Sequence, residues 1–269
     1  MNFTNATKQV IKALEPKIVY HPGNFYVAQM DIGTTPYSAL LVVDTGFETT
    51  WVQNNICIYE INYKDHSHSR GYLSSDTFTF PAHGGERDTH TYLHFGNDAQ
   101  IRGTDQEIVQ TTPLIPNVNM YYVEVLSISM EGKKLPIDPV EFQLRSDFKG
   151  GFAIDTGSAL TYLVQNAYNI VRVEIVKYLQ AYNWNPTVHS ELPYDLCYDV
   201  IPIENQQFPS LTIHFLGANL DQLGSHRVFK LFYDDTFCMF ILPTSQQGTN
   251  ILGAFQQADY QFLFDVGTG

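Results

Sequence analysis

Charged residues, basic residues above all, and long apolar runs are scarce in this chain. Of its 269 residues only 16% are charged and 44% are hydrophobic, which excludes an intrinsically disordered protein. Lysine and arginine number 15 against 28 acidic residues, a net charge of −13 that argues against nucleic acid as a partner. The acidity fits either ordinary solubility or an acidic compartment in which many carboxylates are protonated. No apolar run approaches the roughly 20 residues that span a bilayer, so we expect no membrane partner.

Cysteine is rare too. Cys57, Cys197 and Cys238 match no zinc spacing, and either one disulfide with a leftover thiol or three reduced thiols fits their number. The first residues, Met1–Thr7, hold no apolar stretch of the kind a signal peptide needs, so none is visible. Asn2-Phe3-Thr4 and Asn5-Ala6-Thr7 fit the glycosylation pattern, which is weak support for secretion.

Aromatic residues are abundant, at 14%, and favour β structure. Apolar residues recur at helical spacing over 166–182, which predicts one convincing helix. Period-two patterns over 56–63 and 72–80, on either side of a polar tip at 64–69, predict a long hairpin. Further strands are expected at 25–33, 38–43, 121–130, 210–215, 228–233, 236–242 and 261–266. The pattern is that of a mainly β protein with one or two short helices.

Two apolar runs end in Asp-Thr-Gly. Leu40–Val43 leads into Asp44, and Phe152–Ile154 leads into Asp155. A carboxylate after a buried strand is costly unless the site holds and uses it, so two copies suggest related lobes that each contribute one carboxylate. Two neighbouring carboxyl groups cannot both ionise, and such a pair activates water without a metal.

The residues around each aspartate fit that chemistry. Thr45 and Thr156 can anchor the two loops by hydrogen bonds, and Gly46 and Gly157 permit a tight turn and close backbone approach. The continuations match as well, since each places an aromatic and then an aliphatic residue at the same offset, Trp51-Val52 and Tyr162-Leu163. One copy of the tripeptide is an ordinary turn; the repeat with its flanks is what points to a paired site.

The motifs resemble those of the pepsin-like aspartic proteases, and most closely their plant nepenthesin-like branch. Residues 118–266 carry the resemblance most densely, and the N-terminal part matches in pieces such as Ile32-Gly33-Thr34 and Trp51-Val52-Gln53. The C-terminal motifs are Tyr121-Tyr122-Val123, Leu135-Pro136-Ile137, Asp155-Thr156-Gly157-Ser158, Tyr194-Asp195-Leu196-Cys197-Tyr198, Phe208-Pro209-Ser210-Leu211 and Ile251-Leu252-Gly253-Ala254-Phe255-Gln256-Gln257.

The resemblance implies a bilobed acid-protease fold with a cleft between two β lobes. We expect an N-terminal extension over 1–17, a shortened N-terminal lobe over 18–115 and a C-terminal lobe over 116–269. It further implies an aspartic endopeptidase without cofactor or metal, a monomer acting on polypeptides at acid pH, and a secreted or vacuolar location.

The resemblance also assigns roles to single residues. Asp44 and Asp155 would be catalytic, and Ser158 would support the second loop alongside the threonines and glycines. Tyr63 stands where the family has its flap tyrosine, although an ordinary strand tyrosine fits the pattern equally. Cys197 and Cys238 would form a disulfide, and Ile251-Leu252-Gly253 would close the loop around Asp155.

The N-terminal part departs from the family. Phe47 replaces the serine that usually follows Asp-Thr-Gly, and Phe has no hydroxyl with which to hold the aspartate. Lys64-Asp65-His66 alters the flap tip, and no N-terminal counterpart of Ile251-Leu252-Gly253 is found. These losses favour an alternative, a catalytically weak or inactive binding protein of the xylanase-inhibitor type on the same fold.

Other chemistries have weaker support. A metal site built from Asp65, His66, His68 and the histidines at 83, 90 and 94 is less simple than a polar hairpin tip. No Gly-x-Ser-x-Gly elbow or phosphate-binding glycine loop occurs in the sequence.

Overall fold

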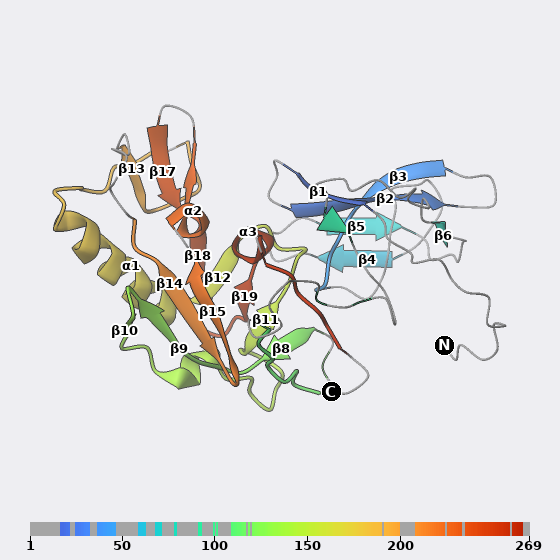
Figure 1. The fold of residues 1–269 in the computed structure, drawn as a ribbon, viewed down its shortest axis with the longest axis horizontal. Coiled ribbons are helices and arrows are strands. Elements are labelled where there is room, and N and C mark those ends of the chain that lie inside the picture. The colour runs from blue at the N-terminus through green and yellow to red at the C-terminus, as the bar shows by residue number, and fades with distance from the viewer. Residues whose placement is uncertain are drawn as a thin grey trace. The chain divides into compact units, whose positions relative to one another are not determined.

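The chain folds into two compact units. The N-terminal unit comprises Met1–His21, Tyr26–Val43 and Glu48–Gln100, and the C-terminal unit comprises Pro22–Phe25, Asp44–Phe47 and Ile101–Gly269. The computed structural model (Figure 1) describes residues 17–21, 25–32, 37–46, 59–62, 68–71, 78–79, 91–92, 99, 101, 109–116, 118, 120–189, 191–199, 208–223, 225–232, 235–258 and 260–265.

The described part of the N-terminal unit is made of β-strands. One sheet has the order β3-β2-β1-β7, with β6 paired to β2, and a separate hairpin joins β4 to β5. The strands are β1 (Lys17–His21), β2 (Phe25–Ile32), β3 (Tyr37–Val42), β4 (Tyr59–Asn62), β5 (His68–Gly71), β6 (Phe78–Thr79) and β7 (Thr91–Tyr92).

The strand that leads to Asp44 is less buried than its apolar sequence indicates. Among the described strands, β3 stands at the edge of its sheet and pairs with β2 alone, from Val27 opposite Val42 to Ile32 opposite Tyr37. Leu40 is 71% exposed, and Val42 is exposed as well. The expectation of a buried strand is therefore wrong for the first Asp-Thr-Gly run, because an edge strand has a neighbour on one side only.

The predicted hairpin exists but its return strand is different. β4 pairs with β5, with Asn62 opposite His68. Phe78–Thr79, in the segment predicted to return on β4, pair with β2 instead. The period-two pattern identifies strands but not their partners, and the pairing of 72–80 with 56–63 is a wrong prediction.

The described residues of the C-terminal unit form three sheets, with the orders β18-β12-β19-β11-β8, β10-β9-β14-β15 and β13-β17-β16. Their strands are β8 (Tyr121–Val123), β9 (Val125–Met130), β10 (Lys133–Lys134), β11 (Phe152–Ile154), β12 (Thr161–Val164), β13 (Cys197–Asp199), β14 (Leu211–Phe215), β15 (Ala218–Leu223), β16 (Phe229–Leu231), β17 (Thr236–Met239), β18 (Ile241–Thr244) and β19 (Asn250–Leu252). The helices are α1 (Gln165–Gln180), α2 (Ser225–Val228), α3 (Ala254–Gln257) and the 3-10 turn η3 (Pro139–Phe142). The described structure is thus mainly β with few helices, as predicted.

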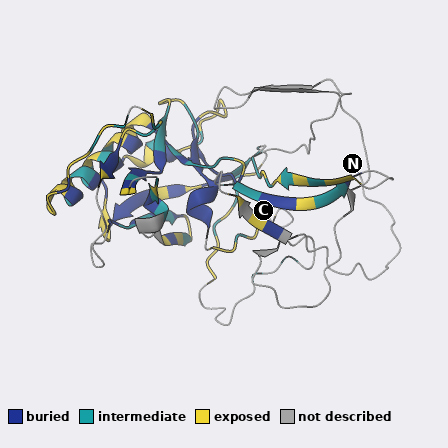
Figure 2. Ribbon diagram, turned by 90° about the horizontal axis from the view of Figure 1, so that it is seen from above, coloured by how far each residue is buried: buried dark blue, intermediate teal, exposed yellow. Residues whose placement is uncertain are grey.

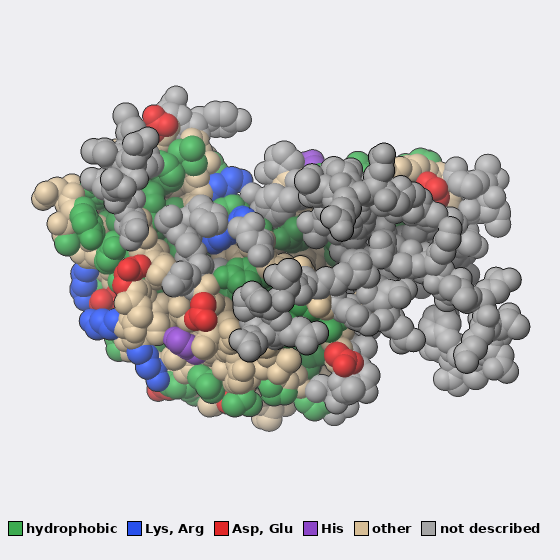
Figure 3. Space-filling view, in the orientation of Figure 1, with side chains coloured by type: hydrophobic (Ala, Val, Ile, Leu, Met, Phe, Trp, Pro, Cys, Tyr) green, Lys and Arg blue, Asp and Glu red, His purple; other side chains and the backbone are tan. Residues whose placement is uncertain are grey.

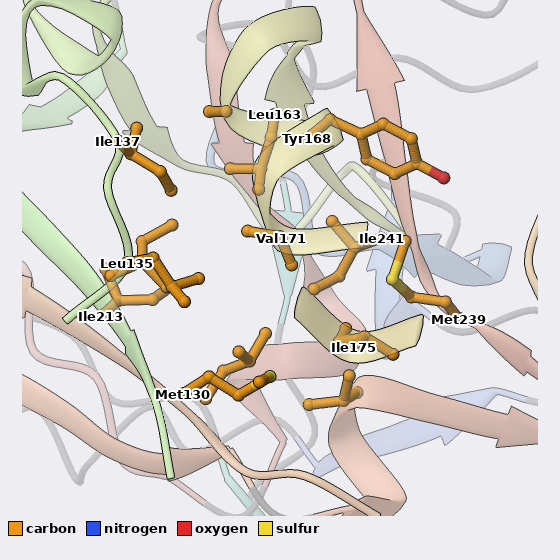
Figure 4. Close-up of a cluster of buried hydrophobic side chains, with 14 of the residues drawn as sticks. Met130, Leu135, Ile137, Leu163, Tyr168, Val171, Ile175, Ile213, Met239 and Ile241 are labelled. Atoms are coloured by element: carbon orange, nitrogen blue, oxygen red, sulfur yellow. The ribbon is translucent and has the colours of Figure 1, made fainter. Parts of the chain in front are cut away.

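Helix α1 closes the core of this unit. Its buried residues Ala167, Tyr168, Val171, Ile175 and Leu179 repeat at helical spacing. Figure 2 shows buried and exposed residues alternating along this helix. Figure 4 shows Val171 and Ile175 beside Ile241 of β18, in one cluster of buried side chains that also includes Tyr168 and Ile213. The predicted helix is confirmed, and its apolar face packs against strand residues of the core.

The disulfide implied by the resemblance is confirmed. Cys197 on β13 and Cys238 on β17 stand opposite each other and are bonded, closing a loop with a sequence separation of 41. Cys57 lies outside the described residues.

The last segment differs from its prediction. Residues 261–265 form no strand, so that prediction is wrong over the described positions. Phe262 and Phe264 nevertheless pack against the core, and the Phe264 ring lies 4.3 Å from that of Tyr121. The alternation of apolar and polar residues over this segment therefore predicted which side chains turn inward, but it did not predict whether the segment pairs as a strand.

Charged side chains of both signs are spread over the face of the C-terminal unit seen in Figure 3. Of the helices that the structure describes, none combines the length and apolar character needed to cross a bilayer.

Candidate active site

Asp155 follows a fully buried strand. β11 pairs in parallel with β19 and antiparallel with β8, so its residues have neighbours on both sides, as Figure 1 shows. The backbone N–H of Asp155 continues this ladder by donating to the Leu252 carbonyl at 3.1 Å. The aspartate is 7% exposed. A buried carboxylate therefore stands at the end of a strand whose position is set by the Ile251–Gly253 segment.

Two donors hold the Asp155 carboxylate. The Gly157 N–H donates to Oδ1 at 2.8 Å, and the Ser158 hydroxyl donates to Oδ2 at 2.8 Å. Both oxygens of this buried carboxyl group thus have a hydrogen-bond donor, which offsets the cost of its burial.

Asp44 has fewer described donors. It leaves β3 after Val43, whose N–H donates to the Tyr26 carbonyl at 2.8 Å, and it accepts the Gly46 N–H at 2.8 Å. Phe47 lies outside the described residues, and its side chain offers no hydroxyl. The loop of Asp44 belongs to the C-terminal unit.

Threonine hydroxyl groups join the two loops reciprocally. The Thr45 N–H donates to Oγ1 of Thr156 at 3.1 Å, and the Thr156 N–H donates to Oγ1 of Thr45 at 2.9 Å. The Thr156 hydroxyl also reaches Oγ1 of Thr45 at 3.4 Å. Two equivalent exchanges of this kind fix the separation and the relative rotation of the loops.

The glycines let each loop approach the opposite aspartate. A Cβ on Gly157 would lie 2.2 Å from Cγ of Asp44, and a Cβ on Gly46 would lie 2.7 Å from Cγ of Asp155. Real Cβ atoms do not come so close to other carbon atoms. The two carboxyl groups therefore share a site that only glycine at both positions leaves open.

This closeness alters the ionisation of Asp44. Burial of the carboxyl by the surrounding atoms and, second, the charge of Asp155 raise its pKa to about 6, while the Gly46 N–H opposes the rise. Asp44 keeps contact with solvent even so. Two carboxyl groups of which one holds its proton toward neutral pH can act as an acid and a base together.

Two further residues behind the Asp155 loop were not singled out from the sequence. Thr161 and Gln256 are buried and hydrogen-bonded to each other at 2.8 Å. The available signal was an amide side chain directly after the apolar run from Ile251 to Phe255, where a polar group needs a partner.

Several of the predicted site residues lie outside the described part of the chain. Tyr63, the candidate flap residue, lies outside the described residues, as do Trp51, His66 and the flap tip around it. Within the described part of the chain, no group of His, Cys, Asp and Glu side chains is arranged to hold a metal ion.

The chain is similar to several known proteins. A family model described as xylanase inhibitor C-terminal matches residues 120–269. Aspartic proteinase nepenthesin-1 of Nepenthes gracilis is 35% identical over 151 residues, which cover 55% of this chain and 33% of that protein. The chain thus spans about a third of this relative.

Longer and more distant matches cover nearly the whole chain. Aspartic proteinase nepenthesin-2 of the same plant is 24% identical over 360 residues, covering 99% of this chain and 80% of that protein. The crystal structure of edgp has a TM-score of 0.66 at 13% identity, and covers 92% of this chain and 91% of that one. At such low identity the structural match supports the fold alone, which is the pepsin-like one.

Proposed function

Because the chain belongs to the family of pepsin-like plant aspartic proteases, we propose that it is an aspartic endopeptidase with Asp44 and Asp155 as its dyad. One observation carries the proposal. Thr45 and Thr156 exchange hydrogen bonds at 3.1 and 2.9 Å, and this exchange holds the two carboxyl groups at one site.

The surroundings of the two carboxyl groups support different roles. Asp155 accepts a hydrogen bond from a hydroxyl and one from an N–H, at 2.8 Å each, so we assign it the role of general base. Burial and the charge of Asp155 raise the pKa of Asp44 to about 6, so we assign Asp44 the proton below that pH. The missing hydroxyl at Phe47 favours the same assignment.

The reaction then needs only water and the peptide. A water held by the pair attacks the scissile carbonyl carbon and gives its proton to Asp155, while Asp44 gives its proton to the carbonyl oxygen. The tetrahedral diol collapses when the amine leaves with the proton from Asp155 and Asp44 recovers its proton from a hydroxyl. No covalent bond to the protein forms, and the dyad ends in its starting protonation state.

The substrate follows from this chemistry and from the family. We propose an unfolded or extended polypeptide cleaved at acid pH, where Asp44 holds its proton, with a secreted or vacuolar location. The relatives named aspartic proteinases support this assignment at 24–35% identity.

Asparagine variants test the dyad. Asp44→Asn and Asp155→Asn each remove a proton-transferring group, and we expect each to lower cleavage of an acid-denatured protein by at least about 1,000-fold. Asp147→Asn, on an exposed turn with its own surface ion pairs, is the matched control. Proteolysis that survives both dyad substitutions would show that another group does the chemistry.

A non-cleaving binding protein is the second candidate. The family model that matches is described as xylanase inhibitor C-terminal, and Phe47 removes a hydroxyl beside Asp44. The same purified protein separates the two candidates. Turnover at about pH 4 that a hydroxyl-bearing transition-state mimic blocks supports the enzyme, and its absence between about pH 3 and 6 supports the binding protein.

A further inference from the structure

A fully buried polar pair lies behind the Asp155 loop. Thr161 on β12 is 2% exposed and Gln256 on α3 is 0% exposed. Burying a hydroxyl and an amide is costly unless their hydrogen bonds are satisfied. Both side chains meet this condition through partners on three separate segments, which indicates a role beyond filling space.

The bonds run in one connected path. The Gly253 N–H donates to Oγ1 of Thr161 at 3.1 Å, and the Thr161 hydroxyl donates to Oε1 of Gln256 at 2.8 Å. Nε2 of Gln256 then donates to the carbonyls of Arg227 at 2.9 Å and Phe240 at 3.1 Å. The path therefore ties Gly253 to α2 and to the residue that joins β17 and β18.

Gly253 is where this path reaches the dyad. Its neighbour Leu252 accepts the Asp155 N–H at 3.1 Å, and its other neighbour, Ala254, donates to the Ser158 carbonyl at 2.8 Å. Ser158 in turn donates to Oδ2 of Asp155 at 2.8 Å. A shift of Gly253 would thus move both the backbone and the hydroxyl that hold the Asp155 carboxylate.

The backbone around Gly253 is closely packed. A Cβ on Gly253 would lie 2.2 Å from the carbonyl oxygen of Leu160, so the backbone segments are nearly in contact. Thr161 follows Leu160 in the chain. Its hydroxyl oxygen accepts the Gly253 N–H, and its hydroxyl proton is donated to Gln256. Serine can do the same, whereas valine fills the space without either bond.

We propose that Thr161 and Gln256 are positioning residues that hold the Gly253 segment, and through it Asp155, in register for catalysis. The expected effect on kcat rests on the proposed function, whereas the expected effect on the position of the Gly253 segment does not. The two side chains act through Gly253 and not by contact with substrate. Because reacting groups misplaced by about 1 Å lose about 100-fold in rate, a small loosening here should be visible in kcat.

Valine and serine variants with a matched control test the threonine. We expect Thr161→Val to lower kcat by about 10- to 100-fold with KM nearly unchanged, and Thr161→Ser to restore most of the rate. Thr236→Val is the control, because Thr236 is also buried and its hydroxyl donates to Asp199 at 2.8 Å, outside the path. Equal kcat for Thr161→Val and Thr236→Val would overturn the proposal.

The Gln256→Glu variant adds a pH-dependent test. A protonated carboxyl group at this position would keep one donor and one acceptor, but an ionised one has no donor for the carbonyls of Arg227 and Phe240. Because burial raises the pKa of such a carboxyl group, we expect the free energy of unfolding of Gln256→Glu relative to wild type to fall as pH rises above about 4. A difference that stays flat up to about pH 7 would contradict a role for the amide donors.

Hydrogen exchange gives a readout that needs no turnover. We expect the amides of Asp155 and Gly253 to exchange faster in Thr161→Val than in Thr236→Val. A wild-type protein that cleaves nothing refutes the proposed function alone, and unequal exchange then still supports the path. Equal exchange in the two variants refutes the path, whatever the activity.

Discussion

Replacing Gly157 by alanine tests whether the two Asp-Thr-Gly loops face each other in the working protein. A Cβ at this position would lie 2.2 Å from both Cγ and Oδ1 of Asp44, and 2.6 Å from Oδ2. The obstacle is thus the carboxyl group of one candidate catalytic residue, placed there by the other loop.

The expected magnitude follows from these distances. Carbon atoms in contact stand about 3.5 Å apart, so the Asp44 carboxyl or the Gly157 backbone must yield by more than about 1 Å. A displacement of about 1 Å costs about 100-fold in rate. Gly46→Ala brings a Cβ to 2.7 Å from Cγ of Asp155, a milder clash, so it should lose less activity than Gly157→Ala.

The assay is kcat for a quenched fluorescent peptide at about pH 4, below the pKa of about 6 of Asp44, with the free energy of unfolding measured alongside. Gly248→Ala is the control, since its Cβ would lie 2.5 Å from Oγ1 of Thr244, away from the dyad. If folded Gly157→Ala were as active as Gly248→Ala, the facing arrangement of the loops would be refuted.

Two further predictions concern stability. The pKa of Asp44 is raised from 3.8 to about 6, so its contribution is present below about pH 4 and lost as pH rises through 6; Asp44→Asn should therefore gain stability over wild type as pH rises across this window. Asp199→Asn is the control, because the pKa of Asp199 is lowered, mainly by the Thr236 hydroxyl, so this variant should lose stability relative to wild type as pH rises. If urea unfolding showed the same pH dependence for Asp44→Asn and Asp199→Asn, the raised pKa of Asp44 would be contradicted. Replacing Cys197 and Cys238 together by serine should cost about 4 kcal/mol, from the entropy of a loop of 41 residues, and an unchanged urea midpoint would refute this.

Local patterns predicted the parts of the fold that depend on local physics. Helix α1 could be predicted because its apolar residues recur at helical spacing and form one face that packs on the core. The alternation over 261–265 correctly reported that Phe262 and Phe264 turn inward, but it could not say whether a neighbouring strand was available. The same limit explains why the return strand of the hairpin at β4 was misassigned.

The candidate site, too, was predictable from the sequence only in part. The repeated Asp-Thr-Gly and its flanks identified Asp44 and Asp155 as a pair, because a carboxylate at a strand end, a small hydroxyl and a glycine are types that such a site requires. The sequence also marked Phe47 as a missing donor. What it lacked was any measure of the exposure of Leu40, since burial depends on what lies beside an edge strand.

Composition and residue order by themselves determined a mainly β protein, its pair of aspartates and its family. Only the tertiary structure decided how those aspartates are held. The exchange of hydrogen bonds between Thr45 and Thr156, and the buried path from Gly253 through Thr161 to Gln256, join residues far apart in the chain. Such contacts leave no periodic signal in a sequence, because their partners are brought together by packing and not by spacing along the chain.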